Sequence, residues 1–195
     1  MLQYLVILGA ALNLSGTYVY IRDIIKGTTK PNRVTYLMWS IAPLIATIAA
    51  LASGVRWAVV PVFATGLGPL LVLTMSLFNK NSYWKLGPYD YICGAFSLLA
   101  LILWGITSQP TIAIIFAIVS DAFAAIPTLK KSWTNPETES GSAYVLAMIA
   151  TITTYAAVKT WVFSEYGFAT YIIFMDGLIV LFVYRRKLMH LGNTA

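Results

Sequence analysis

Two acidic residues lie alone inside long apolar stretches of the chain, and they are its clearest candidates for chemistry. Asp121 falls within the apolar segment 110–129, and Asp176 falls within 161–184. A charge in an apolar medium costs about 3 kcal/mol or more, so such a group usually faces a cavity or a partner. No Lys or Arg lies near the middle of either segment. We expect both carboxyls to couple to protons and Asp121 also to bind a solute. A neutral carboxyl hydrogen-bonded between helices is the structural alternative.

Other polar side chains could complete a solute site around Asp121. Ser120 precedes it, and Asn13 lies at about the same depth in the first apolar segment. Thr151 and Thr154 share a helix face because they are three residues apart. Serine and threonine hydroxyls often bond to their own helix, so that structural role stays open for each of them. A solute contact and a structural role are both open for Asn13, whose amide has more hydrogen-bonding groups to satisfy.

Aromatic and proline residues indicate how access to such a site could change. Trp39 and Tyr144 each lie about one turn inside an apolar segment, which suits either an aromatic belt at a membrane interface or a gate. Proline inside a helix removes a hydrogen bond and permits a kink. We therefore predict hinges at Pro43, Pro69 and Pro127, with static shaping of the helices as the alternative.

Seven apolar segments must position these residues. The chain of 195 residues is 59% hydrophobic and 10% charged, with a mean hydropathy of +0.77, unlike a soluble domain. A helix needs about 20 mostly apolar residues to cross a bilayer. We therefore expect an all-α integral membrane protein. Its seven transmembrane helices are predicted at 2–21, 35–52, 57–78, 89–108, 110–129, 141–158 and 161–184.

The chain repeats itself with an offset of 105 residues, so that residues 5–80 pair with 110–185 without a gap. Twelve of the 76 pairs are identical, including Lys26 with Lys131 and a shared Phe-Ala-Thr triplet. Such an offset indicates a duplicated three-helix unit, and a fourth crossing lets the second unit enter from the same side as the first. We expect two parallel three-helix bundles in a 3+1+3 arrangement. Their predicted bounds are 1–80 and 110–187, with a linker helix in 81–109 and a cytoplasmic tail at 188–195.

Positive charge orients the predicted helices. Of the thirteen Lys and Arg residues, eleven flank one side of the predicted membrane, and only Arg56 and Lys159 flank the other. The positive-inside rule then places the N-terminus outside and the C-terminus in the cytoplasm. We expect the protein to reside in the bacterial inner (plasma) membrane.

The turns after the first and fifth segments have the same plan. Each follows basic residues and contains a proline, Pro31 or Pro136, which stops the preceding helix. Thr35 and Ser140 are then positioned to cap the helices that follow.

Several function classes are disfavoured by the residues present. Cys93 is the only cysteine, which leaves no disulfide framework or cysteine-based metal site. The sequence has no evident nucleophile–base pair, metal-ligand cluster or phosphate-binding glycine loop, so we expect no enzymatic activity, no cofactor and no metal. A retinal-binding photoreceptor needs a lysine deep in its last helix, and the first lysine there is Lys187. The net charge of +6 comes from the flanking turns rather than from a nucleic-acid-binding face.

The 3+1+3 order and the basic, proline-bearing turns resemble those of the SWEET/PQ-loop (transporter-opsin-like) superfamily. Where that family has Pro-Gln, this chain has Pro127-Thr128 in the second repeat and Arg22-Asp23 in the first. The stretch 174–186 looks like the last helix of the cystinosin-like branch, where an acidic residue takes part in proton coupling. The sugar branch has Asn in its third and seventh helices, and this chain has none there. The resemblance is therefore nearer the cystinosin-like PQ-loop branch than the sugar branch.

These observations together predict a small-solute membrane transporter that works by alternating access, with uniport and proton coupling both open. A membrane receptor or sorting protein of the same fold, which binds a ligand without transporting it, is the alternative. The expected partners are membrane lipid and an unidentified small-molecule solute, with no nucleic acid. The chain acts either as a monomer or as a homo-oligomer.

Overall fold

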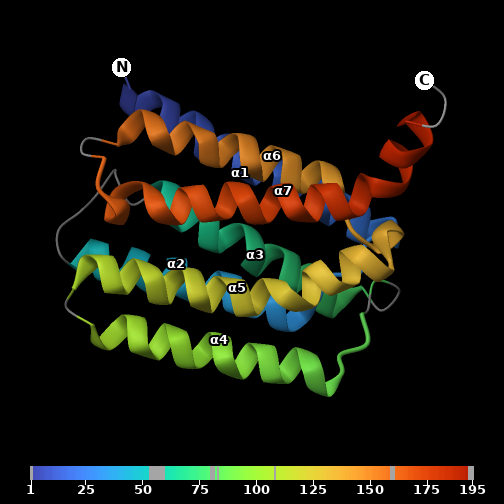
Figure 1. Cartoon of the computed structure of the whole chain (residues 1–195), viewed down its shortest axis with the longest axis horizontal. Coiled ribbons are helices and arrows are strands. Elements are labelled where there is room, and N and C mark those ends of the chain that lie inside the picture. The colour runs from blue at the N-terminus through green and yellow to red at the C-terminus, as the bar shows by residue number, and fades with distance from the viewer. Residues whose placement is uncertain are drawn as a thin grey trace.

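The computed structural model describes residues 2–52, 60–79, 82, 84–107, 109–158 and 161–192, and over these residues it contains helices and no strands. The described residues form seven α-helices. The helices lie side by side, and α1 begins at the end of the molecule opposite to that where α7 ends (Figure 1). The α-helices are α1 (Leu2–Ile25), α2 (Arg33–Ala52), α3 (Val60–Phe78), α4 (Pro88–Ile106), α5 (Pro110–Thr134), α6 (Gly141–Ile152) and α7 (Phe163–Gly192). Two short 3-10 helices, η3 (Pro136–Thr138) and η4 (Thr153–Ala157), flank α6.

The prediction of an all-α fold is confirmed over the described residues. The predicted segments match the α-helices in order, except that the sixth, predicted to reach residue 158, ends as an α-helix at Ile152 and continues as η4. Three of the helices searched over the described residues are long and apolar enough to cross a membrane. These are Pro88–Ile106, Thr111–Thr134 and Tyr166–Lys187, while shorter apolar stretches cover Arg33–Ile48, Val62–Phe78 and Gly141–Ala156.

Three predicted helix ends were placed too early. α1 continues past residue 21 to Ile25, so Arg22 lies in its last turn. α5 continues past residue 129 to Thr134, so Lys130 and Lys131 lie in its last turns rather than in the following turn. α7 likewise continues past residue 184 to Gly192 and includes the basic residues that we expected at its end. Lysine and arginine are good helix formers and suit the negative end of the helix dipole, so the helices continue through them.

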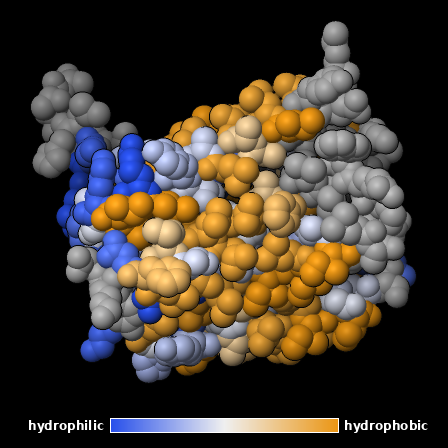
Figure 2. Space-filling model, turned by 180° about the vertical axis from the view of Figure 1, so that it is seen from behind, coloured by the Kyte–Doolittle hydropathy of each residue, from blue (hydrophilic) through white to orange (hydrophobic). Residues whose placement is uncertain are grey.

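Polar and apolar residues separate along the length of the molecule. Figure 2 shows hydrophilic residues gathered at one end and a broad apolar surface over the remainder of the visible described face. This hydrophilic end, called here the basic end, contains the last turns of α1, α5 and α7, with Arg22, Lys131 and Arg185. Arg56 and Lys159, predicted for the opposite side, lie outside the described residues.

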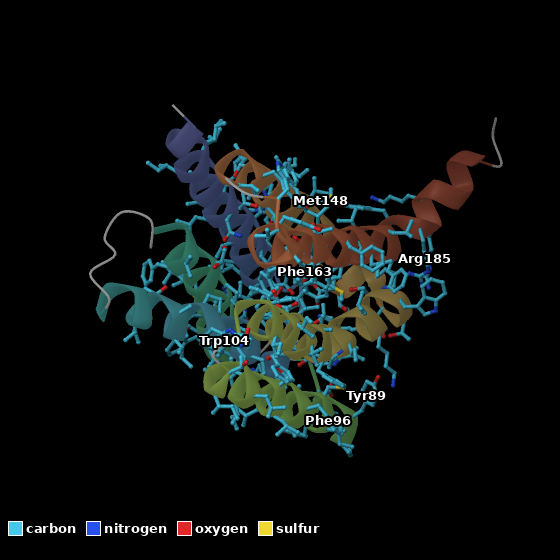
Figure 3. The ribbon with its side chains drawn as sticks, turned by 60° about the vertical axis from the view of Figure 1, so that its left-hand side comes forward. Tyr89, Phe96, Trp104, Met148, Phe163 and Arg185 are labelled. Atoms are coloured by element: carbon cyan, nitrogen blue, oxygen red, sulfur yellow. The ribbon has the colours of Figure 1, made fainter. Side chains whose placement is uncertain are left out.

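Six of the helices contact one another in a closed order. α3 contacts both α1 and α2, and α7 contacts both α5 and α6. Contacts of α1 with α6 and of α2 with α5 complete the ring. α4 packs outside this ring, against α5 and α2. Consistently, Phe96 of α4 and Met148 of α6 lie on opposite sides of the molecule in Figure 3.

Close helix contacts within the ring depend on small residues. A Cβ atom at Gly66 of α3 would lie 2.9 Å from Leu44 Cγ and 3.1 Å from the Leu44 backbone nitrogen on α2. A Cβ atom at Gly16 of α1 would lie 3.0 Å from the Ala143 carbonyl oxygen on α6. Apolar lipid supplies little hydrophobic force between helices, so close backbone packing of this kind is an important source of helix association in a membrane.

The helix caps differ from the prediction. Asn32, rather than Thr35, caps α2, because its Oδ1 accepts hydrogen bonds from the backbone N–H groups of Val34 and Thr35. Ser140 does precede α6, but its hydroxyl makes no capping hydrogen bond and donates to Asp23 instead. α2 begins at Arg33, so Thr35 lies inside its first turn, whereas the Ser140 hydroxyl is engaged by a partner from a distant part of the chain.

The predicted prolines lie inside helices. Pro43 falls within α2, Pro69 within α3 and Pro127 within α5. Each position is therefore compatible with the predicted hinge, which stays a prediction. The largest buried apolar cluster comes from five helices of the ring and is Tyr20, Ile24, Tyr36, Val72, Ala143, Tyr144 and Ile179.

Candidate functional site

The Asp121 carboxylate is held between three helices. Tyr171 on α7 donates a hydrogen bond of 2.8 Å to its Oδ2 atom. The indole of Trp39 on α2 approaches the same carboxyl. The Trp39 Nε1 atom is buried and makes no hydrogen bond of ordinary geometry to a described residue. Asp121 is thus at the junction of α2, α5 and α7, with one oxygen held by a phenol and an indole close by.

Asp176 lies within electrostatic range of Asp121 and is more deeply buried. Only 8% of its surface is exposed, and its Oδ2 atom is buried without a hydrogen bond from a described residue. Its carboxyl interacts electrostatically with Asp121 and with the tyrosine side chains Tyr36, Tyr144 and Tyr171. A buried, unpaired acceptor is uncommon in a folded protein, and it indicates a group that takes a proton or meets a ligand.

Three tyrosines from different helices pack together next to the acids. The ring of Tyr20 on α1 lies 5.2 Å from that of Tyr36 on α2 and 6.1 Å from that of Tyr144 on α6, between centroids. The Tyr36 and Tyr144 hydroxyls share a hydrogen bond of 3.0 Å. The Trp39 ring packs edge-on against Tyr36 at 5.4 Å. The two residues predicted as a gate, Trp39 and Tyr144, therefore both contact Tyr36.

A buried ion pair lies between the three tyrosines and the basic end. Lys131 Nζ and Glu139 Oε1 lie 2.5 Å apart, and neither side chain has exposed surface. Glu139 Oε2 accepts hydrogen bonds from the hydroxyls of Tyr20 at 2.7 Å and Tyr144 at 3.4 Å. Lys131 also donates to the Lys30 carbonyl oxygen. One carboxylate oxygen therefore meets the ammonium and the other meets two phenols, all inside the protein.

Tyr20, Tyr36 and the Lys131–Glu139 pair were not predicted as functional residues. The match of Lys131 with Lys26 across the repeat was the only sequence signal near this cluster. Lys131 is fully buried, whereas Lys26 is exposed. The two equivalent lysines therefore have different structural roles in the two halves of the chain.

Several predicted solute ligands lie elsewhere. Ser120 faces α4, where its hydroxyl lies 3.1 Å from that of Ser97 and donates to the Ser97 carbonyl at 2.8 Å. Thr151 and Thr154 donate to the carbonyls of Ala147 and Thr151 in their own helix, at 2.9 and 2.7 Å, which is the structural alternative left open for them. The Asn13 amide oxygen would lie 3.5 Å from a Cβ atom at Gly68 on α3. The structure thus groups Asp121, Asp176, Trp39 and Tyr144, but it does not bring Ser120 to them.

Two hydrogen bonds are equivalent to each other under the 105-residue offset. Ser140 Oγ donates to Asp23 Oδ2 at 2.6 Å, and Thr128 Oγ1 donates to Thr35 Oγ1 at 3.1 Å. Thr35 corresponds to Ser140 and Asp23 to Thr128 in the repeat. Thr35 Oγ1 in turn donates to the Ala124 carbonyl at 2.7 Å. The same two positions are therefore linked twice, each time between the first and second halves of the chain.

An open depression of about 430 Å³ lies beside the ion pair at the basic end. It is called here the basic-end depression. Glu139 and Ser140 contribute to its wall, and further lining residues include Asp23, Glu137, Tyr184, Arg186 and Lys187. Arg185, labelled at this end in Figure 3, is not among the residues that line the depression. Its guanidinium packs on Trp133, 4.5 Å from the ring centroid.

The side chains around the two acids are suited to binding and to proton exchange. Among the residues that the structure describes, no group of three or more His, Cys, Asp or Glu side chains could hold a metal ion. The central groups are carboxyls, phenols and an indole, which bind protons, amines, hydroxyls or apolar surfaces. Comparison with known proteins gives no match: no family model, curated protein or solved structure is significantly similar to this chain.

Proposed function

We propose that the protein is a small-solute membrane transporter that works by alternating access. In this proposal α1–α3 and α5–α7 form two parallel three-helix bundles, and α4 joins them in a 3+1+3 arrangement. The closed order of helix contacts supports it, because α3 and α7 each lie between the other two helices of their bundle. The paired hydrogen bonds of Ser140 with Asp23 and of Thr128 with Thr35 support a common plan for the two halves.

One observation carries the functional proposal. Asp176 has a buried oxygen without a hydrogen-bond partner among the described residues, and it interacts electrostatically with Asp121. Ionisable groups inside a membrane are costly and commonly mark substrate or proton pathways. The two acids therefore suit a site where a solute binds and where a proton is gained or lost.

The proposed cycle uses the groups around these acids. Solute binds beside Asp121 and Asp176, and protonation of either carboxyl removes negative charge from the site. The neutral and charged forms then favour different open sides, since a ligand or proton shifts an equilibrium by its differential affinity for the two states. Trp39 and Tyr144 control access, and Pro43, Pro69 and Pro127 act as hinges. Asn13, Thr151 of α6 and Thr154 of η4 remain candidate solute contacts from the sequence alone.

The proposed orientation and family follow the same reasoning. The basic end faces the cytoplasm of a bacterial inner membrane, so the N-terminus is outside. The proposed relatives are the SWEET/PQ-loop proteins, nearer the cystinosin-like branch. Support comes from the seven helices and from the concentration of basic residues at one end of the molecule.

Reconstitution into proteoliposomes tests the proposal. The purified chain is offered a panel of amino acids, amines, sugars and nucleosides, with and without a pH gradient, and uptake is measured. At least one solute is expected to enter faster than in empty vesicles, and Asp176→Asn is expected to reduce that uptake. Glu137→Gln, which changes an exposed acid at the basic end, provides a matched control. Absence of uptake for the whole panel would count against transport.

A receptor or sorting protein of the same fold is the second candidate. The same central acids favour it, since they would bind a ligand whether or not the bundles move. A thermal-shift screen of the same panel at two pH values separates the two functions. Ligand binding raises the apparent stability in both cases, but only a transporter also carries the ligand across the vesicle membrane.

A further inference from the structure

The Lys131–Glu139 pair is positioned between the two halves of the chain. Glu139 belongs to the turn before α6, and it accepts a hydrogen bond from Tyr20 on α1. Lys131 belongs to α5, and it donates to the carbonyl of Lys30 in the turn after α1. The backbone N–H of Lys30 also donates to the Thr138 carbonyl at 2.9 Å. Every one of these three links joins the first half to the second.

The pair also separates the central acids from the basic-end depression. On its inner side, Glu139 contacts Tyr144, whose hydroxyl is bonded to Tyr36 and whose ring interacts electrostatically with Asp176. On its outer side, Glu139 contributes to the wall of the depression. The ring of Trp84, 5.3 Å from the Lys131 ammonium, covers the pair from the segment before α4. The cluster therefore lies between the central acids and the basic-end depression.

We propose that Lys131, Glu139 and Tyr20 form a latch that closes the solute pathway at the basic end, and that the structure holds this latch shut. The inference rests on the two-bundle arrangement proposed above and adds residues that the transport proposal does not use. Opening separates Tyr20 and the Lys30 carbonyl, on the first bundle, from Glu139 and Lys131 on the second. The Lys131–Glu139 pair itself remains on the second bundle.

An ion pair suits a closure that must open repeatedly. The desolvation of two buried charges offsets much of the free energy of their attraction. Such a pair therefore adds little net stability compared with packed apolar groups. When the bundles separate at the basic end, water enters and solvates both charges again. Lys26 provides the contrast. It occupies the equivalent position in the first repeat, is exposed, and has no role in the latch.

Distance measurements between spin labels test the latch without requiring a solute. Labels are attached at Thr28→Cys, in the turn after α1, and Ser142→Cys, at the start of α6, in a Cys93→Ala background. Both label positions are exposed in the structure. The full chain in lipid nanodiscs is expected to give one short distance. Lys131→Met together with Glu139→Gln is expected to add a second, longer population.

Two further variants keep the test decisive. The double substitution Tyr20→Phe with Tyr144→Phe keeps both rings but removes both hydroxyl donors to Glu139, and it is also expected to lengthen the distance. Lys26→Met removes an exposed charge at the equivalent position of the first repeat and is expected to leave it unchanged. A wild-type distance in the phenylalanine variant overturns the latch, even where the charge variant does not fold. Lengthening in Lys26→Met to the same extent overturns it as well.

Transport and latch can fail separately. Lengthened distances in a protein that moves no solute retain the latch and reject the transporter. Uptake that is measured alongside unchanged distances in the latch variants retains the transporter and places its closure elsewhere.

Discussion

Tyr171 on α7 donates a hydrogen bond of 2.8 Å to the Asp121 carboxylate on α5, while Asp176, also on α7, has an oxygen with no such donor among the described residues. The two central acids are therefore not equivalent. A phenol that donates to a carboxylate favours its charged form, and a buried oxygen without a donor favours the neutral form. The two carboxyls are therefore separate candidates for proton coupling, and each needs its own substitution.

Replacement of Asp121 by Asn is expected to abolish the pH dependence of solute binding or uptake while leaving the fold intact. The amide has nearly the same shape, can still accept the Tyr171 hydrogen bond through its oxygen, and does not ionise. Uptake measured between pH 5 and pH 8 checks the effect, with circular dichroism to confirm the helical content. Glu137→Gln should keep the wild-type pH profile. An unchanged profile in Asp121→Asn removes Asp121 from the proton-coupling mechanism.

Removal of one partner from the buried ion pair is expected to destabilise the protein more than removal of both. Lys131→Met leaves the Glu139 carboxylate buried without its counter-ion, which typically costs about 3–5 kcal/mol. Adding Glu139→Gln to it should recover much of that loss, because no uncompensated charge remains. Thermal unfolding in detergent micelles measures both variants. Lys26→Met, at the equivalent exposed position, should melt close to the wild type, and a loss there as large as in Lys131→Met would contradict the assignment to burial.

Gly66→Ala is expected to destabilise the contact between α2 and α3. The new methyl group would meet the side chain and backbone of Leu44, and overpacking of this kind typically costs about 1–3 kcal/mol. Gly105→Ala is the matched control, because a Cβ atom there has no heavy atom within 4 Å apart from its own surroundings in the helix. The melting temperature of the first variant should fall, and that of the second should stay the same or rise. Equal shifts would show that helix propensity, not packing, decides the outcome.

Asn32→Ala is expected to cost about 1 kcal/mol through loss of the α2 cap, and more because Asp90 also loses a donor. Asn32 Nδ2 donates to Asp90 Oδ1 at 2.8 Å, so one side chain ties the start of α2 to the start of α4. Thr134→Ala, which removes a hydroxyl bonded to carbonyls of its own helix, serves as control. Thermal unfolding compares the two variants, and a smaller loss in Asn32→Ala than in the control would argue against the cap.

The helices could be predicted because each depends on a local property of the chain. An apolar run of about 20 residues must cross the bilayer, and prolines such as Pro31 and Pro136 interrupt the chain between runs. The end of α5 was wrong because Lys130 and Lys131 extend a helix as readily as they flank one. Composition alone does not distinguish these two outcomes.

The acids were found from the sequence because a charge in an apolar segment is conspicuous. Their partners were not, because Tyr171 lies 50 residues from Asp121 and Tyr20 lies 119 residues from Glu139. Such pairs depend on which helices become neighbours, and tyrosine is common at many other places in this chain. Ser120 was misplaced for a related reason. It is adjacent to Asp121 in sequence, but the next residue along a helix points about 100° away, here toward α4.

The external position of α4 makes the two joints between the halves of the ring unequal. α4 contacts both α2 and α5, so it braces the joint where those two helices meet. In the described part of the chain, no α-helix outside the ring packs on both α1 and α6, and only the short η4, which continues α6, contacts both. In the proposed transporter, the two halves should therefore separate more along α1 and α6 than along α2 and α5. A transported solute should then enter nearer α1 and α6 than α2 and α5. The unmatched helix α4 thus determines which side of the ring opens.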